Sequence, residues 1–365
     1  MKVRGPAANF ARNLLDQVRA GIQIFNFGEI TMQRELITFG VIVGFLLSSV
    51  GHAEEKKLFP FTVGYSSVSG GRTPLWIAKD RGIFEKYGLD VKLVFIRAGA
   101  TVTQALIGGD IQMTAATGSA TIAAAARGAP VVIIAAVGPS PYKLVAHSSI
   151  TSVQGLRGKT IGTSRRGSNP EFALLRLLPR LGLTPGKDVY LIPTGLTESD
   201  QRITLVVQGK IDATAAGAEA VLQAELRGQK VNILADFLDM GVYASGSDFS
   251  TTRQFLKSHP REIKAFLMAF IEATALGKRN KEIAQQTFRK YLMAENPKLL
   301  ESMYNTYFVK TLPAKPYPQE EAIQADIEDL SAAIPELRGR KPAEFIDTTL
   351  LKEIESEGFF ARLQK

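Results

Sequence analysis

The sequence predicts an α/β protein built from two similar lobes. Residues 106–136 and 206–236 align without a gap at a constant offset, with identical pairs such as Thr114/Thr214, Ala115/Ala215, Arg127/Arg227 and Gly128/Gly228. In each copy a glycine turn precedes an apolar run ending in Thr-Ala-Ala, then a helical segment closed by Arg-Gly and a second apolar run. This order is typical of a strand, helix, strand unit. Chance similarity of Ala/Gly-rich segments is the alternative to a duplication. We expect a ligand cleft between the two lobes.

Length and composition are those of an ordinary globular protein. The chain of 365 residues is long enough for two domains, and 45% apolar with 22% charged residues argues against a disordered or polytopic membrane protein. The formal net charge is +9, but Lys and Arg are scattered among acidic residues instead of clustering with aromatic ones. Nucleic acid binding requires such clustering, so we expect no nucleic acid partner. The excess charge indicates a solubility role or mild attraction for anionic solutes.

Cysteine is absent and histidine is scarce. Without cysteine, the chain has no disulfide, thiolate nucleophile or Cys-ligated zinc. His147 and His259 are far apart in sequence, so metal or histidine-base chemistry is not expected. We therefore expect no metal ion, no cofactor and no catalytic residue, and we predict that the protein is not an enzyme.

The amino-terminal segment predicts export. Residues 36–50 are apolar, follow Arg34 and precede Gly51-His52-Ala53, which fits a secretory signal peptide cleaved after Ala53. The stretch before it is too long for a signal peptide, but a start at Met32 restores ordinary proportions. We expect residues 1–53 to be an over-extended start plus signal peptide, and the body to lie outside the cytoplasmic membrane. An uncleaved anchor is the alternative.

Residues 54–145 are expected to form the first part of lobe 1. Thr73 followed by Pro74 predicts a helix start with Thr73 as the N-cap. The alternation of strands and helices predicts a largely parallel sheet. The predicted elements are a strand at 59–65, the helix from Thr73, a strand at 91–96, a helix around 102–107 and the first copy of the unit.

Residues 146–238 are expected to form lobe 2, entered by a crossing at 143–146. The pattern of apolar runs and turn residues continues as in lobe 1. The predicted elements are a strand at 160–163, a turn at 164–169, a helix at 170–181, a strand at 189–192, a helix near 200–207 and the second copy.

Residues 239–365 are expected to return to lobe 1 through 241–245 and to continue as helices beyond Ser250. The clearest helix spans 262–276, and 313–318 is a proline-rich connector. Helical spacing places one apolar stripe on the former, which predicts core packing. The stripe comprises Ile263, Phe266, Leu267, Phe270, Ile271 and Thr274.

Short motifs occur in order along residues 58–310. In the first half they are residues 74–79, 82–84, 87–91, 105–106 and 109–111; in the second half they are 156–162, 181–183, 208–213 and 259–266. Each motif alone is weakly specific. The ordered set resembles the nitrate, sulfonate and taurine type of ABC-importer solute-binding proteins.

The resemblance implies a type II periplasmic-binding-protein fold with two α/β lobes joined by two crossing strands. A small-molecule ligand would be held between the lobes by closure and delivered to the permease of an ABC importer. The membrane would be contacted only through that permease, and we expect a monomer.

The resemblance also implies where the ligand binds. In lobe 1 the matching positions are Ser66, Ser67, Gly99, Thr117, Gly118 and Ser119. In lobe 2 they are Ser164, Arg165, Arg166, Ser168, Gly217 and Glu219. An anionic headgroup at the 164–168 turn would meet unpaired amides of the following helix and the hydroxyls of the turn, with Arg165 or Arg166 as a bidentate partner.

Each of these assignments has a structural alternative. The two arginines are equally consistent with a solvated surface, and the hydroxyl residues with turn and cap roles. Trp76 either stacks on a ligand or packs between the first helix and the sheet. Glu219 stands where the first copy has Ser119. A carboxylate there would disfavour a bound anion and favour an amine or zwitterion.

Two further functions stay open. The protein could be the ligand-binding partner of a membrane sensor, which would use the same cleft. It could also be an enzyme like the pyrimidine-forming proteins that the family resembles, although those depend on a Cys-rich segment and an active-site histidine.

Overall fold

The computed structural model describes residues 57–242 and 247–363, and residues 57–365 make one compact unit. The expected signal peptide, its cleavage after Ala53 and the start at Met32 lie outside the described residues. Within the described ranges, none of the helices combines the length and apolar character that crossing a bilayer demands.

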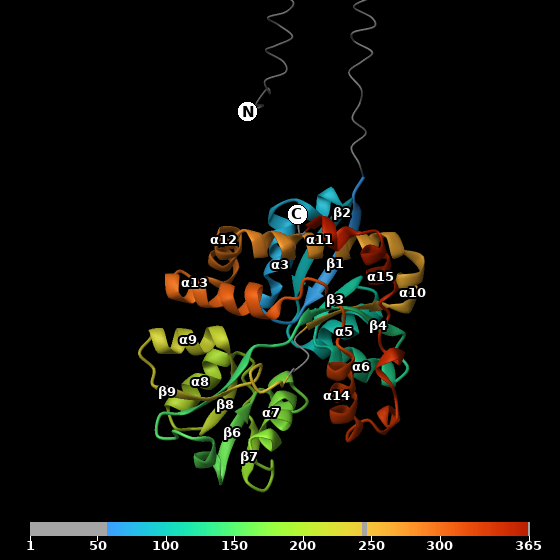
Figure 1. The fold of residues 1–365 in the computed structure, drawn as a ribbon. Coiled ribbons are helices and arrows are strands. Elements are labelled where there is room, and N and C mark those ends of the chain that lie inside the picture. Colours follow the sequence, from blue (N-terminus) through green and yellow to red (C-terminus); the bar gives the residue numbers. More distant parts are fainter. Residues whose placement is uncertain (1–56, 243–246, 364–365) are drawn as a thin grey trace, which may run out of the picture. The chain divides into compact units, whose positions relative to one another are not determined.

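The first sheet has the strand order β2-β1-β3-β10-β4 (Figure 1). β1 is parallel to β2 and β3, whereas β10 is antiparallel to β3 and β4. The largely parallel sheet is confirmed, with β10 as its exception. The expectation of helices alone beyond Ser250 missed this strand. The strands are β1 (Phe59–Tyr65), β2 (Leu89–Phe95), β3 (Met113–Ala116), β4 (Val131–Gly138) and β10 (Ser247–Thr252).

The second sheet repeats this plan in the order β7-β6-β8-β5-β9. β5 is antiparallel to β8 and β9, as β10 is to its neighbours in the first sheet. The residues expected to cross between the lobes, 143–146, are part of β5, so the chain has already reached the second sheet at Tyr142. The strands are β5 (Tyr142–His147), β6 (Lys159–Thr163), β7 (Val189–Pro193), β8 (Ala213–Gly217) and β9 (Val231–Asp236).

The two copies of the repeated unit have the same element order. The first is β3, α6 (Gly118–Ala126) and β4, and the second is β8, α9 (Ala218–Leu226) and β9. Both helices end at the Arg-Gly pair, where the glycine adopts a positive φ of 90° at Gly128 and 74° at Gly228. Glycine reaches this conformation without the steric cost of a side chain.

We call each sheet with the helices packed on it a lobe. The helices of lobe 2 are α7 (Asn169–Arg180), α8 (Ser199–Val207) and α9, with the short 3-10 turn η2 (Val153–Leu156). Its largest apolar cluster includes Leu144, Ile161, Leu174 and Leu177. This cluster is separate from the cores of lobe 1, so each lobe has its own hydrophobic support.

Lobe 1 contains the amino-terminal and carboxyl-terminal helices. Its amino-terminal elements are η1 (Gly70–Arg72), α3 (Thr73–Asp80), α4 (Ile83–Lys86), α5 (Gly99–Gly108) and α6. The N-cap of α3 is Arg72 and not Thr73, because the helix begins one residue earlier than its sequence signal indicates. The later elements are α10 (Arg253–Ser258), α11 (Pro260–Arg279), α12 (Lys281–Leu292), α13 (Pro297–Tyr304), η3 (Asn305–Thr311), α14 (Glu320–Ser331), η4 (Pro335–Leu337), η5 (Pro342–Glu344), α15 (Thr349–Ser356) and α16 (Phe359–Leu363).

The apolar stripe of α11 forms the centre of the main core. Phe266 stacks on Phe61 and Phe84 and meets Phe249 of β10 edge to face, with ring centroids 5.1–5.6 Å apart. All six stripe residues are buried. The core packing predicted for this helix is therefore confirmed.

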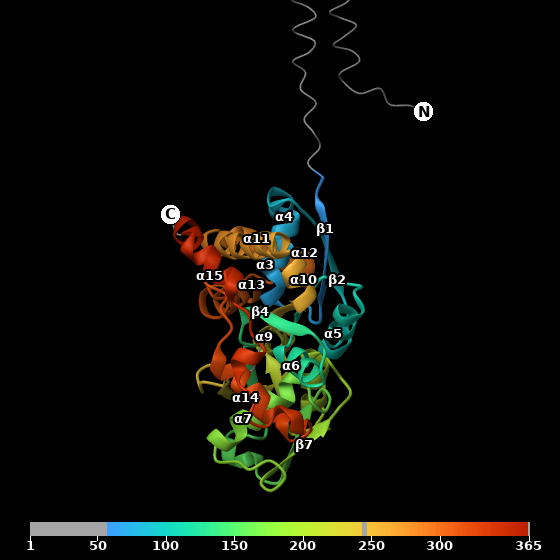
Figure 2. The same ribbon diagram turned by 90° about the vertical axis from the view of Figure 1, so that its right-hand side faces the viewer.

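The segment η3 is a π-helix seated against three glycines of lobe 1. An added Cβ would lie 2.1 Å from the Tyr307 ring at Gly70, 2.1 Å from the Phe308 ring at Gly277 and 2.5 Å from the Thr311 carbonyl oxygen at Gly138. Further along the chain, α14 packs on α6 (Figure 2). The carboxyl-terminal region thus belongs to lobe 1.

Candidate functional site

The lobe 1 loops that the sequence singled out lie together at the carboxyl ends of parallel strands. Ser66 and Ser67 follow β1, Gly99 begins α5 after β2, and Thr117 to Ser119 follow β3. A Cβ at Gly99 would stand 2.9 Å from the Thr117 hydroxyl oxygen, so the second and third loops touch. The fold therefore brings these predicted positions to one edge of the sheet.

A buried arginine lies behind the first loop. The Arg72 side chain is 2% exposed, and its Nη2 donates to the Ser67 hydroxyl at 3.1 Å. Its Nε has no hydrogen-bond partner. Burial lowers the pKa of Arg72 to about 10, although Tyr307, Asp248 and Tyr65 act to raise it. Arg72 therefore stays cationic at neutral pH with a donor to spare.

Asp248 of β10 lies at the start of α6. It is 4% exposed and lies against Gly118, where an added Cβ would stand 2.2 Å from Asp248 Oδ2, an atom that has no hydrogen-bond partner. Burial and the nearby Asp326 raise the pKa of Asp248 to about 8, against the lowering effect of the Gly118 amide and of Arg72. The predicted contact residue Gly118 thus has an acidic neighbour that the sequence did not indicate.

In lobe 2, the predicted turns lie beside the start of β5. Ser164 is buried, the Asn169 amide donates to Ser140 at 3.1 Å, and the Ala218 N–H donates to the Pro141 carbonyl at 3.1 Å. The Gly217 N–H donates to the Ser199 hydroxyl at 3.2 Å. These contacts fix the turns after β6 and β8 against the segment that enters the lobe.

The turn after β8 is held from behind by Arg202 of α8, which is buried. Its guanidinium donates to the Ala215 carbonyl at 3.0 Å, the Thr197 carbonyl at 2.7 Å and the Leu196 carbonyl at 3.0 Å. These neutral acceptors account for its donors without a ligand. Arg202 therefore supports the backbone next to Gly217.

Glu219 connects the lobes. Its Oε2 accepts a hydrogen bond of 2.8 Å from the Tyr307 hydroxyl of η3. Burial raises the pKa of Glu219, while its own backbone N–H and the Tyr307 hydroxyl lower it. Burial also raises the pKa of Tyr307, with a further upward contribution from Glu219 and Tyr142 and a lowering one from Arg72. Tyr307 therefore stands between charged groups of both lobes.

Other predicted positions have different surroundings. Arg165 and Arg166 are exposed, and neither guanidinium has a polar partner among the described residues. Ser168 accepts from the Arg165 backbone N–H at 3.4 Å, which is the turn role that was weighed against ligand contact. Ser119 is buried at the first turn of α6.

Trp76 is buried by packing. Its ring stacks on Tyr291 of α12 at a centroid distance of 4.7 Å and meets Tyr65 edge to face at 6.4 Å. One ring face is thus covered by a neighbouring helix. The packing alternative accounts for these contacts, and the assignment of Trp76 as a ligand residue stays a prediction.

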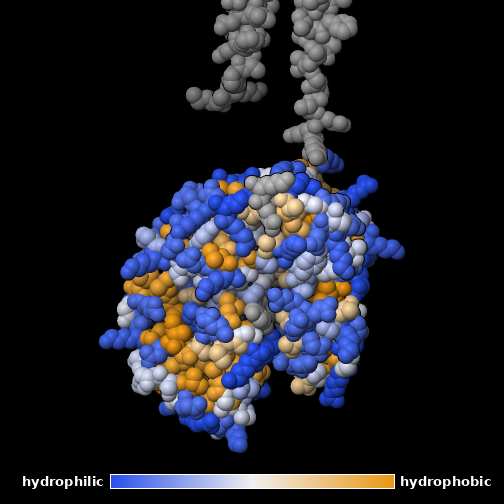
Figure 3. Space-filling model, in the orientation of Figure 1, coloured by the Kyte–Doolittle hydropathy of each residue, from blue (hydrophilic) through white to orange (hydrophobic). Residues whose placement is uncertain are grey.

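A groove of about 570 Å³ lies between lobe 2 and the carboxyl-terminal helices. Its lobe 2 wall includes Ala218, next to Glu219, and Leu222, while Lys298 and Lys310 lie on the other wall. Figure 3 shows apolar surface gathering over the part of lobe 2 that Figure 1 labels β8, β9 and α9. The groove therefore combines apolar side chains with charged ones of both signs, since Glu225 and Glu301 also line it.

Arg72, Asp248 and Tyr307 are the site residues that sequence reasoning missed. Arg72 lies two residues before the recognised motif at 74–79, and its position was a usable signal. The sequence around Asp248 and Tyr307 does not mark them as site residues. They reach the loops only because β10 pairs with β3 and because η3 packs against Gly70. Within the described residues, no cluster of His, Cys, Asp and Glu is arranged to hold a metal ion.

The sequence matches the model of a known protein family. A family model described as NMT1/THI5 like matches residues 71–281, more than half of the chain. Among curated proteins, no sequence matches this one.

Several solved structures have the same architecture. The alkanesulfonate-binding protein SsuA from Xanthomonas axonopodis pv. citri has a TM-score of 0.63 and 22% identity, over 80% of this chain and 98% of its own. The periplasmic aliphatic sulphonate binding protein SsuA from Escherichia coli has a TM-score of 0.62 and 24% identity, over 77% and 91%. The periplasmic nitrate-binding protein NrtA from Synechocystis PCC 6803 has a TM-score of 0.58 and 16% identity, over 84% and 88%. These likenesses confirm the two-lobed periplasmic-binding-protein fold.

Proposed function

Because the chain belongs to the NMT1/THI5-like family, we propose that it is a periplasmic solute-binding receptor of an ABC importer. It captures a small organic ligand between its lobes and delivers it to the importer's permease, without catalysing a reaction. The binding residues are those of the loops described above, joined by Arg72 and Asp248. Support comes from the family, from the fold shared with sulfonate-binding and nitrate-binding proteins, and from the junction of the lobes.

The observation that carries this proposal is that two buried charged residues beside the lobe 1 loops, Arg72 and Asp248, lack part of their hydrogen bonding. Arg72 Nε and Asp248 Oδ2 are both buried without a hydrogen-bond partner. Buried polar groups in native proteins almost always have a partner, and each exception needs an explanation. A ligand that enters between the loops would supply the missing partners.

The charges of the junction favour a zwitterionic ligand over a simple anion. Arg72 is a cation that suits a carboxylate or sulfonate, whereas Asp248 and Glu219 are carboxyl groups that burial keeps from ionising freely. A ligand ammonium would stabilise their charged forms. The exposed pair Arg165 and Arg166 contributes no buried charge to this balance.

Matched ligand pairs test the proposal. Thermal unfolding is measured with propionate against 3-aminopropionate and with ethanesulfonate against 2-aminoethanesulfonate. Ligand at a hundred times its Kd stabilises a native state by about 2.7 kcal/mol, so a bound compound raises the Tm by a few degrees. We expect the amine-bearing members to give the larger shift. Equal shifts within each pair would contradict the zwitterion assignment and leave the receptor function standing.

Two arginine variants locate the anion contact. Arg72→Gln is expected to abolish the ligand-induced Tm shift, and Arg165→Gln to preserve it. The reverse result would place the anion at the 164–168 turn, as the sequence predicted. Mass spectrometry of small molecules that co-purify with the protein gives an independent measurement, and finding no bound compound and no Tm shift with any extract fraction would refute the receptor function.

A further inference from the structure

Arg176 of α7 joins lobe 2 to the carboxyl-terminal region. Its Nη2 lies 2.6 Å from Asp326 Oδ1 and 2.7 Å from Asp329 Oδ2, and its Nε donates to Asp329 Oδ2 at 2.8 Å. Both acidic residues belong to α14. Burial acts to lower the pKa of Arg176, but the two carboxylates outweigh this effect and raise it. The guanidinium is thus held as a cation by a pair of carboxylates on one helix.

The α14 helix is fixed to lobe 1 by its apolar face. Ile323 and Ile327 share a cluster with Ile122 of α6 and Ile133 of β4. The Arg176 and Asp326 side chains are 12% and 2% exposed, so water screens this contact little. The ion pair of Arg176 with Asp326 and Asp329 therefore links lobe 2 to lobe 1.

A second bond between the lobes lies at α9. The Tyr307 hydroxyl donates to Glu219 at the first turn of α9, and the Tyr307 ring is held in the space above Gly70. In Figure 1, α13 and α9 lie on one side of the junction, and α14 and α7 lie on the other. The two contacts are therefore made by different helices of lobe 2, one at α9 and the other at α7.

We propose that residues 297–331 act as a strap that holds the lobes together through these two contacts. Arg176 and Tyr307 are positioning residues in this arrangement. They determine how often the protein adopts the joined arrangement, in which both contacts between the lobes are formed. They therefore act on the ligand site by setting the distance between the lobe 1 loops and the lobe 2 loops. If only the joined arrangement binds tightly, the apparent Kd is the intrinsic Kd divided by its population. This consequence for affinity rests on the proposed function, whereas the strap itself does not.

The lack of cysteine makes a direct distance measurement possible. Cysteines introduced at the exposed residues Lys92 of lobe 1 and Lys187 of lobe 2 carry spin labels in the full chain. Pulsed electron paramagnetic resonance then gives the distribution of distances between the lobes. We expect a single narrow distribution in the parent protein. The double variant Arg176→Met/Tyr307→Phe is expected to show a broader distribution with a population at longer distance.

A matched control separates loss of the strap from loss of any ion pair. Lys264 also binds two carboxylates of a carboxyl-terminal helix, Glu353 and Glu357, but lies within lobe 1. Lys264→Met is expected to leave the distance distribution unchanged. Circular dichroism shows that each variant is folded, and Asp329→Asn with Tyr307→Phe serves as the milder variant if Arg176→Met unfolds the chain.

The outcomes are distinguishable from failure of the receptor function. A distance distribution that is the same in the parent and in the folded strap variants would overturn the strap, whatever ligand the protein binds. A shift in distance confirms the strap even if no ligand is found. Where a ligand is found, the strap variants are expected to raise its Kd by about tenfold, and Lys264→Met by less than twofold.

Discussion

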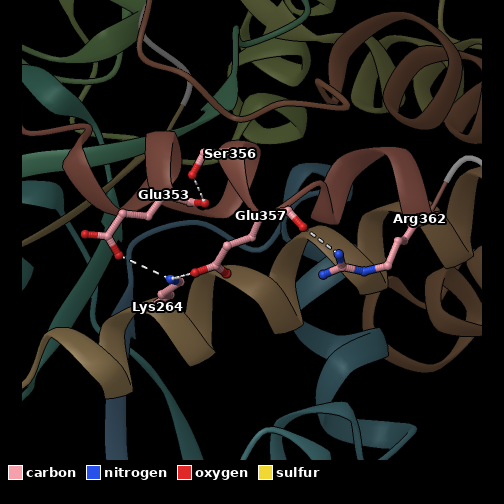
Figure 4. Close-up of polar contacts among 5 residues, drawn as sticks. All are labelled: Lys264, Glu353, Ser356, Glu357 and Arg362. Carbon is pink, nitrogen blue, oxygen red and sulfur yellow. Dashed lines mark hydrogen bonds and ion pairs between the residues drawn. The ribbon is translucent and has the colours of Figure 1, made fainter.

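Two cations in this protein are each bound by two carboxylates of one carboxyl-terminal helix, yet their surroundings differ. Lys264 of α11 binds Glu353 of α15 at 3.2 Å and Glu357, the C-cap residue of α15, at 2.6 Å (Figure 4). Arg176 binds Asp326 and Asp329 on α14 at comparable distances. The Lys264 partners are 49% and 51% exposed, whereas Asp326 is 2% exposed. Similar geometry thus serves two purposes, because solvent screens one cluster and not the other.

The difference shows why ion pairs cannot be compared by counting bonds. Exposed pairs are worth about 0–1 kcal/mol, because the high dielectric of water and side-chain entropy offset the attraction. A buried pair adds little net stability, but removal of one partner leaves an uncompensated charge. The Arg176 cluster therefore determines how the lobes are placed, while the Lys264 cluster is a local contact within lobe 1.

The largest expected effect is that of Arg176→Met. The variant leaves Asp326 and Asp329 without their cation, so we expect the free energy of unfolding to fall by about 3–5 kcal/mol in urea titrations. The triple variant with Asp326→Asn and Asp329→Asn should recover part of this loss, because the uncompensated charges are gone. A single variant as stable as the parent would show that the cluster is solvated in solution.

Asp248 extends the comparison to a carboxyl group near Asp326. Its pKa in the folded protein is raised to about 8 by burial and by Asp326. A raised pKa means that its contribution to stability is complete below the unfolded value near 3.8 and is lost as pH rises to about 8. We expect the free energy of unfolding to fall by up to about 1.4 kcal/mol per pH unit across this window.

The variant Asp248→Asn tests whether Asp248 is the source of this pH dependence of the free energy of unfolding. Denaturant titrations at pH 5, 6, 7 and 8 should show a smaller slope in the variant than in the parent. The slope of Lys264→Met should equal that of the parent, since its ion pairs lie away from Asp248. An unchanged slope in Asp248→Asn would mean that Asp248 is ionised throughout, with Arg72 as its effective counter-charge.

Substitutions at Gly70 and Gly71 test how tightly the Tyr307 ring of the strap packs against lobe 1. Gly70→Ala places a Cβ about where the Tyr307 ring lies, at 2.1 Å, whereas the nearest contacts of a Cβ at Gly71 are at 3.9 Å. Overpacking of this kind costs about 1–3 kcal/mol. We expect Gly70→Ala to lower the Tm by several degrees and Gly71→Ala to change it little. Equal effects would mean that backbone flexibility, and not the Tyr307 seat, determines the response.

The smallest expected effect is that of Lys264→Met. The exposed cluster should contribute less than about 1 kcal/mol to the free energy of unfolding. Added salt should reduce even this difference, because the Debye length falls to about 3 Å at 1 M. A loss comparable to that of Arg176→Met would remove the distinction between the two clusters.

Much of the fold could be predicted because its signals are local. Apolar alternation marked β1, the Thr-Ala-Ala runs marked β3 and β8, and helical spacing marked α11. The strand β10 escaped because its sequence, SDFSTT, holds one apolar residue. Its buried hydroxyls are satisfied by distant partners, as when Thr121 donates to Ser250 and Thr251 donates to the Gln112 carbonyl, both at 2.8 Å.

The candidate site could be predicted in part for the same reason. Loops after parallel strands converge by topology, which is why the predicted positions Gly99 and Thr117 lie side by side. The partners Arg72, Asp248 and Tyr307 come from three distant segments, and their burial depends on contacts across the whole of lobe 1. Charge in a turn, as at Arg165 and Arg166, indicates nothing about burial, and both residues are exposed.

The return of β10 to the first sheet bears on the order in which the lobes can fold during synthesis. Ribosomes deliver residues in order, and domains tend to fold as they emerge. β3 and β4 flank β10 in the first sheet, so a growing chain that ends before Ser247 has a vacant slot between them. All strands of the second sheet, by contrast, emerge as one uninterrupted stretch. The second sheet is thus the first that can form all of its strand pairs, although its residues are made later. The first sheet stays incomplete until β10 has been made.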